Sequence, residues 1–166
     1  MFKFPNFLNC ILVFMFSSLL LPGCGKVQKQ IGEAPELSLK NYAGETFTLT
    51  PKDGKVTLLV FWATWCGPCL REIPSLVELH EKLKGQNFQV VAINMDDSIG
   101  SLVLPIIKNF GITYPTLIGK EQVTKDYGGI QYLPTSFLIG RDGLLKEKMQ
   151  GFVTPGELFA KIKVLL

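Results

Sequence analysis

The sequence predicts an α/β protein with a mixed central β-sheet flanked by helices. Three observations lead to this fold class. Continuous runs of β-branched and aromatic residues, typical of strands buried on both faces, alternate with segments of helical periodicity. Two short alternating segments precede these runs, and an antiparallel strand pair with a final helix follows them. With 166 residues, the chain has the size of one domain around one core.

Composition divides the chain into three parts. Residues 1–23 are predicted to be a signal peptide, residues 24–33 a polar tether without periodicity, and residues 34–166 the folded domain. The domain opens with two alternating segments around Ala43 and Gly44, which predict a β-hairpin.

The elements expected after the hairpin follow from hydrophobic periodicity. Strands are expected at 55–63, 88–95, 114–119, 134–140 and 144–152, and helices at 69–85, 101–111, 120–128 and from 154 onward. Because Pro74 lies inside the first helical pattern, we expect a kink there. Thr154, followed by Pro155 and Glu157, predicts a capping box at the start of the last helix.

The N-terminal segment differs in composition from the rest of the chain. It contains one early cation, Lys3, and no acidic residue. Its apolar run over residues 11–21 is shorter than the roughly 20 residues that span a bilayer, so it fits the core of a secretory signal. The run ends in "LPGC", which resembles a bacterial lipoprotein box with Cys24 as the lipidated residue. A signal anchor or a cleaved peptide without lipid is the alternative. The lipoprotein interpretation predicts a membrane-anchored protein in an oxidising, extracytoplasmic space.

The charge pattern bears on the class of partner. The chain has 17 Lys and Arg against 14 Asp and Glu, and its net charge of +3 is spread without a basic block. A nucleic-acid binder usually gathers such an excess into a patch. We therefore expect no nucleic-acid partner.

Cys66 and Cys69 are the thiols that remain if the signal peptide is removed and Cys24 carries lipid. They stand where a predicted buried strand passes into a helix, whose free N–H groups favour a thiolate. Cys66 comes first and should be the more acidic and more exposed thiol, with Cys69 one turn inside. Gly67 and Pro68 between them allow the tight turn. The pair is therefore predicted to be catalytic: Cys66 attacks a substrate disulfide, and Cys69 resolves the mixed disulfide.

Three other interpretations of the cysteine pair fit the sequence less well. Structural zinc needs four ligands, whereas the mature chain adds only His80, which is expected on a solvated helix face, so no metal is predicted. An inert buried pair is disfavoured because a helix start beside Trp65 is usually exposed. The opening "APELSLKNYAG" resembles peroxiredoxins, but Leu59 and Ala63 replace the Pro and Thr that precede the reactive cysteine of those peroxidases.

Sequence motifs carry a resemblance to a known family. "FWATWCGPC", the following Pro74 and "YLPTSFLI" resemble the thioredoxin superfamily. Together with the opening "APELSL", they are similar to the TlpA/ResA branch of membrane-tethered thiol–disulfide oxidoreductases, from about Ala34 to the C-terminus. The resemblance implies a thioredoxin fold with a βα unit inserted between Cys69 and Pro134.

The resemblance also implies roles for residues around the cysteines. Pro134 corresponds to the cis-proline that lies against the active disulfide, and with Leu133 it would bind the substrate chain. Trp65 and the dipeptide Gly67-Pro68 would support the active site, and this dipeptide, which thioredoxin shares, favours reduction.

The proton acceptor for the second cysteine is the point at which the sequence departs from the family. The buried acid of thioredoxin is replaced by Val60. ResA-like enzymes keep a Glu just after the second central strand, and the alignment of "INMDDS" places Asp97 there. Asp97 is therefore the expected acceptor for Cys69, with a solvated loop carboxylate as the alternative.

The function implied by the resemblance is reduction of protein disulfides without a cofactor. Substrates would be apocytochrome c cysteines before haem attachment, or other secreted disulfides. A membrane protein of the DsbD or CcdA type would re-reduce the enzyme. The rival is a tethered adaptor that binds proteins without turnover, but such a module has no need of both Cys66 and Cys69.

Overall fold

The computed structural model describes Met1 and residues 32–96 and 100–166. The predicted signal peptide, most of the tether with Cys24, and Asp97 lie outside the described residues. No helix among the described residues is long and apolar enough to cross a bilayer.

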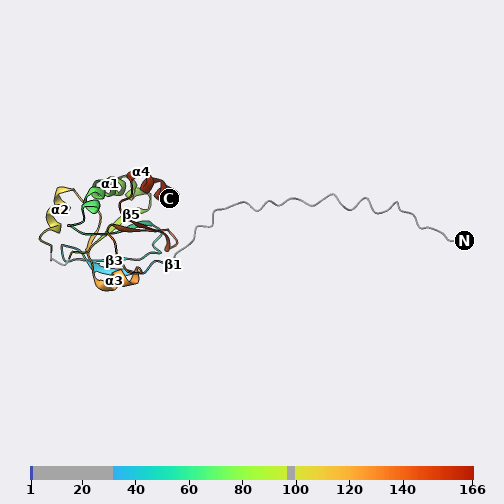
Figure 1. Ribbon diagram of the computed structural model, residues 1–166, viewed down its shortest axis with the longest axis horizontal. Helices are drawn as coiled ribbons and strands as arrows, with labels where there is room; N and C mark the ends of the chain where they lie inside the picture. Colours follow the sequence, from blue (N-terminus) through green and yellow to red (C-terminus); the bar gives the residue numbers. More distant parts are fainter. Residues whose placement is uncertain (2–31, 97–99) are drawn as a thin grey trace.

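Strands and helices alternate through the domain as the periodicity predicts (Figure 1). In chain order the elements are β1 (Gly32–Glu33), β2 (Leu37–Lys40), β3 (Thr46–Leu49), β4 (Val56–Trp62), α1 (Gly67–Leu83), a 3₁₀ turn η1 (Lys84–Gln86), β5 (Phe88–Asn94), α2 (Val103–Asn109), β6 (Thr116–Ile118), α3 (Glu121–Asp126), β7 (Thr135–Ile139), β8 (Leu144–Gln150) and α4 (Pro155–Lys163).

The central sheet is mixed, as expected. Its strand order is β1-β8-β7-β4-β5-β6, and β2 pairs with β3 in a separate hairpin. Strand β5 is parallel to β4 and to β6, whereas β7 is antiparallel to β4 and β8 is antiparallel to β7. All seven residues of β4 are buried, because this strand lies in the middle of the sheet with both faces covered.

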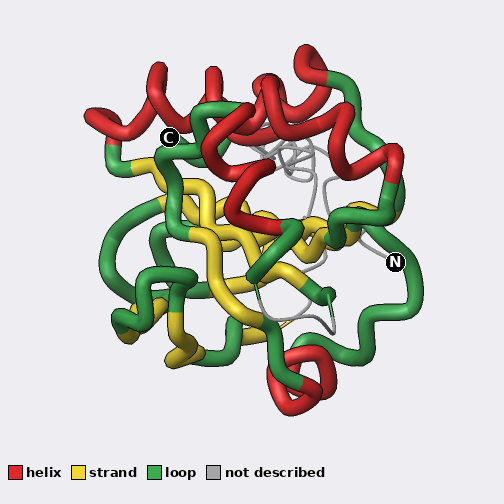
Figure 2. Tube along the Cα trace, turned by 90° about the vertical axis from the view of Figure 1, so that its left-hand side faces the viewer, coloured by secondary structure: helices red, strands yellow, loops and turns green. Residues whose placement is uncertain are grey.

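The two faces of the sheet carry different layers. Alternate residues of β4, such as Leu58 and Val60, pack with apolar side chains of α1 and α4. The intervening residues, such as Leu59 and Phe61, pack against the β2–β3 hairpin and α3. Figure 2 shows this arrangement, with most helical turns on one side of the strands and the short α3 on the other.

The segment between β5 and β7 contains the inserted unit that the family resemblance implies. Strand β6 extends the sheet beyond β5 at its edge, and α3 follows it on the hairpin side. The last helix begins at Thr154 as predicted, where the hydroxyl accepts the Glu157 N–H at 3.4 Å.

The domain boundary differs from the expected one by two residues. Gly32 and Glu33, which we assigned to the tether, form β1 and pair with Leu145 and Leu144 at the sheet edge. This pairing uses main-chain groups of an exposed polar dipeptide, so no hydrophobic pattern marks it in the sequence.

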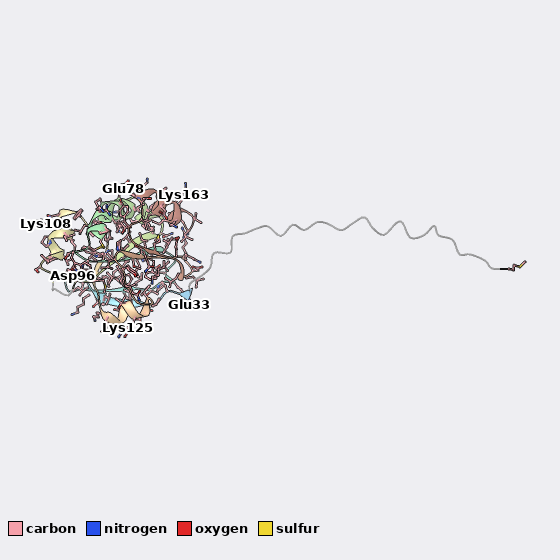
Figure 3. The ribbon with its side chains drawn as sticks, in the orientation of Figure 1. Glu33, Glu78, Asp96, Lys108, Lys125 and Lys163 are labelled. Carbon is pink, nitrogen blue, oxygen red and sulfur yellow. A yellow bond between two sulfur atoms is a disulfide. The ribbon has the colours of Figure 1, made fainter. Side chains whose placement is uncertain are left out.

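Charged side chains are distributed over the domain surface. The labelled lysines Lys108, Lys125 and Lys163 lie on three different helices, α2, α3 and α4, which occupy different sides of the view (Figure 3).

Candidate active site

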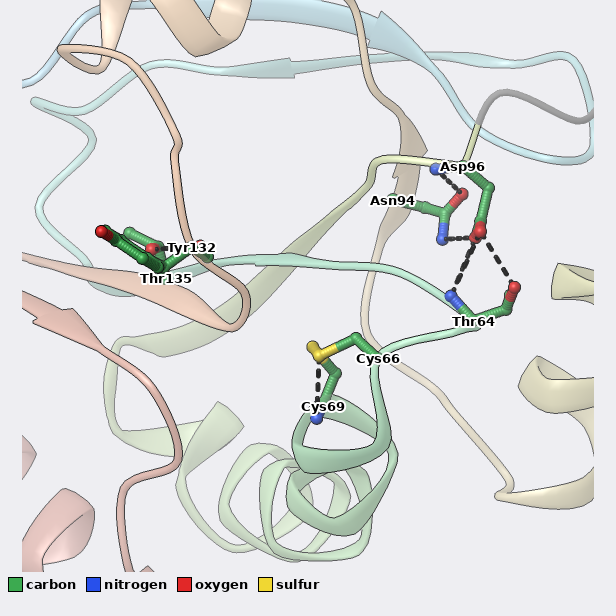
Figure 4. The surroundings of a disulfide bond; sticks show 7 residues. All are labelled: Thr64, Cys66, Cys69, Asn94, Asp96, Tyr132 and Thr135. Atoms are coloured by element: carbon green, nitrogen blue, oxygen red, sulfur yellow. Dashed lines mark hydrogen bonds between the residues drawn. A yellow bond between two sulfur atoms is a disulfide. The ribbon is translucent and has the colours of Figure 1, made fainter.

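The two cysteines lie at the junction of β4 and α1, where they form a disulfide with the Cα atoms 5.2 Å apart (Figure 4). Cys66 is the N-cap of α1: its backbone is extended, and its Sγ accepts the backbone N–H of Cys69 at 3.2 Å. Gly67 and Pro68 form the exposed first turn between them. A sulfur held in this position faces the free N–H groups and the positive dipole end of α1, which stabilise a thiolate.

The exposure of the site differs from one residue to the next. Trp65 is 72% exposed, as expected, whereas Cys66 is 5% and Cys69 2% exposed in the disulfide state. Both cysteines are therefore buried in this state, because they pack in the core cluster with Trp62 and Ala63. The expected exposure of Cys66 is not seen, and Cys66 is more accessible than Cys69 by a small margin only.

The loop before β7 lies beside the disulfide (Figure 4). The Leu133–Pro134 peptide bond is cis, as the family resemblance implies. The register of β7 on β4 sets Thr135 opposite Phe61, which places Pro134 beside the segment that leads to Cys66. The loop is fixed by a bond from the Thr135 hydroxyl to the Tyr132 carbonyl at 2.7 Å. The Pro134 carbonyl accepts the Gly151 N–H at 2.8 Å, so it is occupied within the domain.

Exposed aromatic side chains occur on three segments: the turn before α1, the cis-proline loop and the residues after β8. Trp65 precedes Cys66, Tyr132 lies on the cis-proline loop with 64% of its surface exposed, and Phe152 follows the end of β8. The guanidinium of Arg71, on α1, lies 5.2 Å from the centre of the Phe152 ring. We call Trp65, Tyr132 and Phe152 the aromatic rim. An exposed apolar rim of this kind suits an extended protein segment better than a small polar molecule.

Glu72 is a buried acid beside Cys69 that the sequence analysis did not single out. It is 1% exposed and lines a small cavity with Cys69, Trp62, Tyr114 and Val60. Burial raises the pKa of the Glu72 carboxyl to about 7, although a hydrogen bond from the Val153 backbone works in the opposite direction. Within the described part of the chain, its Oε2 atom has no hydrogen-bond partner.

Val60 leaves the strand without a proton acceptor for Cys69, and Glu72 is a candidate for that role. Val60 and Glu72 line the same cavity as Cys69, so α1 places a buried acid there although the strand carries Val60. A carboxyl with a pKa near 7 beside Cys69 is suited to accept the proton of that thiol at neutral pH. Asp97, our expected acceptor, lies outside the described residues, and its role stays a prediction.

A signal for Glu72 was present in the sequence. The buried face of α1 contains Cys69, Ile73 and Leu76, and Glu72 lies three residues after Cys69 on that same face. The helical periodicity expected over 69–85 rests on apolar residues only, so it gives no place to a charged residue on the buried face. A single charged residue within the buried face of a helix, one turn from a reactive cysteine, indicates a buried acid beside that cysteine.

His80 also differs from expectation, because it is half-buried rather than solvated. Its Nδ1 accepts the Val90 N–H at 3.3 Å, and its ring packs edge-on against Tyr114. Desolvation lowers the pKa of His80, which favours the neutral ring that this hydrogen bond needs. The imidazole therefore completes the backbone pairing of β5 where β6 does not reach.

Residues 32–148 match the family described as AhpC/TSA. The chain belongs to this family. It is 34% identical over 139 residues to the thiol–disulfide oxidoreductase ResA of Bacillus thuringiensis strain Al Hakam, covering 83% of this chain and 80% of that protein. The predicted relationship to ResA-like proteins is thereby confirmed.

Solved structures agree on the fold. A putative thiol:disulfide interchange protein DsbE from Chlorobium tepidum is 31% identical, with a TM-score of 0.72 over 82% of this chain and 95% of that one. The pneumococcal exposed lipoprotein thioredoxin Etrx1 of Streptococcus pneumoniae strain TIGR4 is 26% identical, with a TM-score of 0.65 over 79% of this chain and 100% of that one. The predicted thioredoxin fold is confirmed. The protein is a thiol–disulfide oxidoreductase, and it carries a Cys66–Cys69 disulfide.

Proposed function

We propose that this oxidoreductase reduces disulfides of proteins outside the cytoplasm while lipid on Cys24 holds it at a membrane surface. The single observation that carries the chemistry is the Cys66–Cys69 disulfide at the N-terminus of α1, next to the exposed Trp65. The compartment and the anchor rest on the "LPGC" motif that follows the apolar run at residues 11–21.

The proposed cycle starts from the reduced dithiol. The Cys66 thiolate attacks one sulfur of the substrate disulfide, and the other substrate sulfur leaves and takes up a proton. Glu72 then accepts the proton of the Cys69 thiol, and the resulting thiolate attacks Cys66. This breaks the mixed disulfide, and the second substrate sulfur leaves with a proton. Two electrons have moved from the enzyme to the substrate, which restores the disulfide seen in the structure.

The proposed substrates are extended segments that contain a disulfide. The exposed rings of the aromatic rim offer apolar contact area on three separate segments, which fits a polypeptide. Apocytochrome c before haem attachment, with its two nearby cysteines, has this chemistry, as do other secreted disulfides. A membrane protein of the DsbD or CcdA type would return the electrons.

Substrate trapping in the native host tests this proposal. Cys69→Ala leaves Cys66 able to attack but removes the resolving thiol, so mixed disulfides should accumulate. We expect mass spectrometry of the trapped species to identify extracytoplasmic proteins, with apocytochrome c among them. The matched control is the double variant Cys66→Ala/Cys69→Ala, which should trap nothing. A trapped set made up only of cytoplasmic proteins would contradict the proposed compartment.

The anchor is tested separately with Cys24→Ser. Loss of the lipid-accepting thiol should release the protein from the membrane fraction, because several acyl chains bind a bilayer far more strongly than the marginal binding of one. Mass spectrometry of the mature N-terminus should find Cys24 as the first residue, carrying lipid. An unmodified Cys24, or a chain that still begins at Met1, would rule out the lipoprotein.

A further inference from the structure

A chain of hydrogen bonds joins the β2–β3 hairpin to the turn that carries Cys66. Its members are Tyr42, Asn94, Asp96 and Thr64, which we call the Asp96 network. Tyr42 lies in the hairpin turn, Asn94 ends β5, and Thr64 lies between β4 and α1. Figure 4 shows Asn94, Asp96 and Thr64 grouped beside the disulfide.

Asp96 binds Thr64 through both its backbone and its side chain. The Thr64 N–H donates to Oδ2 at 3.0 Å and to Oδ1 at 3.3 Å, and the Thr64 hydroxyl donates to Oδ1 at 2.9 Å. Hydrogen bonds to a carboxylate are stronger than those between neutral groups, and a two-point contact also fixes orientation. Asp96 therefore holds this residue both in position and in orientation.

The Asp96 carboxylate is itself held in place by hydrogen bonds with Asn94. Asn94, 1% exposed, donates its side-chain N–H to Asp96 Oδ2 at 2.6 Å and accepts the Asp96 backbone N–H at 3.2 Å. The Tyr42 hydroxyl donates to the same Asn94 oxygen at 2.7 Å. Desolvation, with the nearby charge of Asp96, raises the pKa of Tyr42 to about 12, so this donor stays protonated. The network thus connects Thr64 to the sheet and to the hairpin.

Thr64 lies in the turn that sets the position of Cys66. The Cys66 N–H donates to the Ala63 carbonyl at 3.2 Å, which closes the turn around Thr64 and Trp65. The Cys66 Sγ then accepts the Cys69 N–H, the contact through which α1 stabilises a negative sulfur. A change in the orientation of Thr64 would therefore move this turn and, with it, the Cys66 sulfur.

We propose that Asp96 is a positioning residue for Cys66, acting through Thr64 to keep the sulfur aligned with the N-terminus of α1. This role concerns the exchange chemistry of Cys66 itself, and it is independent of the compartment, anchor and substrate proposed above. It also gives the N-terminal hairpin a function, since Tyr42 supports the network.

The test is the pH profile of Cys66 alkylation by iodoacetamide in the reduced full-length protein, with Cys69→Ala as the common background. Thr64→Val removes the hydroxyl donor without changing any charge, and Thr64→Ser restores it. We expect Thr64→Val to raise the midpoint of the alkylation profile by about 0.5 to 1 pH unit. Thr64→Ser should return the midpoint to that of the parent. A role in stability alone would change the melting temperature and leave the midpoint unmoved.

The decisive comparison is a double-mutant cycle with Asp96→Asn. If Thr64 acts through Asp96, Thr64→Val should shift the midpoint in the parent and have no further effect once Asp96 is replaced. Asp126→Asn, an exposed carboxylate on α3, is the matched control and should leave the profile unchanged. The proposal is overturned if Thr64→Val leaves the midpoint at the parent value, or if its shift persists in full beside Asp96→Asn.

Discussion

Cys66→Ser should abolish disulfide reduction, whereas Cys69→Ser should give a protein that attacks once and stays attached to its substrate. The reason is positional: Cys66 caps α1 beside exposed Trp65, while Cys69 lies one turn inside and is 2% exposed. We therefore expect Cys66, at the start of the helix, to attack the substrate and Cys69, behind it, to resolve the mixed disulfide. The measurement is reduction of a model protein disulfide, followed by non-reducing gels of each variant.

Alkylation order gives an independent check on the roles of the two cysteines. Mild treatment of the reduced protein should label Cys66 first, with an apparent pKa below the ordinary value of about 8.5. Cys69 should react only after Cys66 has been modified. Two findings would overturn the assignment: prior labelling of Cys69, or stoichiometric zinc in the purified reduced protein.

The chemistry of the cysteine pair could be predicted because its determinants are local. The buried run at β4, the apolar face of α1 and the two intervening residues are adjacent in the sequence, and together they define a strand-to-helix junction with a sulfur at the cap. The capping of α4 by Thr154 was predictable for the same reason. Local patterns of this kind hold because tertiary packing reinforces them rather than competing with them.

The surroundings of the pair could not be predicted in the same way, because they depend on distant contacts. Asp96 meets Thr64 across 32 residues of sequence, and Tyr42 meets Asn94 across 52. No periodicity specifies that Asp96, which follows β5, turns toward Thr64. The edge strand β1 and the role of His80 depend on backbone partners, which leave no side-chain pattern.

The structure places different polar groups around the two sulfurs. Asp96, engaged by Thr64 and Asn94, stabilises the turn that leads to Cys66. Glu72, without a hydrogen-bond partner at Oε2 among the described residues, lies in the cavity beside Cys69. A fully bonded carboxylate is suited to holding a position, whereas a buried carboxyl with a free oxygen is suited to exchanging a proton. The attacking and resolving cysteines are therefore served by acids with different roles.

Glu72→Gln should slow resolution of the mixed disulfide by about 100-fold near neutral pH, since removal of a general base typically costs 10² to 10⁴ in rate. Gln keeps the size of the side chain and its contact with Val153 but cannot take a proton from Cys69. The rise in resolution rate that Glu72 produces as pH increases through about 7 should disappear in the variant. The first attack by Cys66 should be little affected, which separates this loss from a general failure to fold.

The same substitution should increase stability at high pH, and this readout requires no substrate. The pKa of Glu72 is raised from 4.5 to about 7 in the folded protein, so folding favours its protonated form. Its contribution to stability is fully present below pH 4.5 and is lost as pH rises through 7. Since one pKa unit corresponds to about 1.36 kcal/mol, the charged carboxylate costs about 3 kcal/mol above pH 7. Urea unfolding of the oxidised proteins should show that the free energy of unfolding of Glu72→Gln rises relative to that of the parent between pH 5 and 8.

Asp97→Asn is the matched comparison, because it removes the other carboxylate that the sequence offers as acceptor for Cys69. If Glu72 is the acceptor, Asp97→Asn should leave the pH profile of resolution unchanged while Glu72→Gln alters it. The opposite pattern would return the role to Asp97 and leave Glu72 as a buried acid that only costs stability. Use of oxidised protein for unfolding removes both thiols from the titration, so the stability and rate measurements test Glu72 independently. Agreement between them would show that the carboxyl beside Cys69 is retained at a cost in stability because resolution needs it.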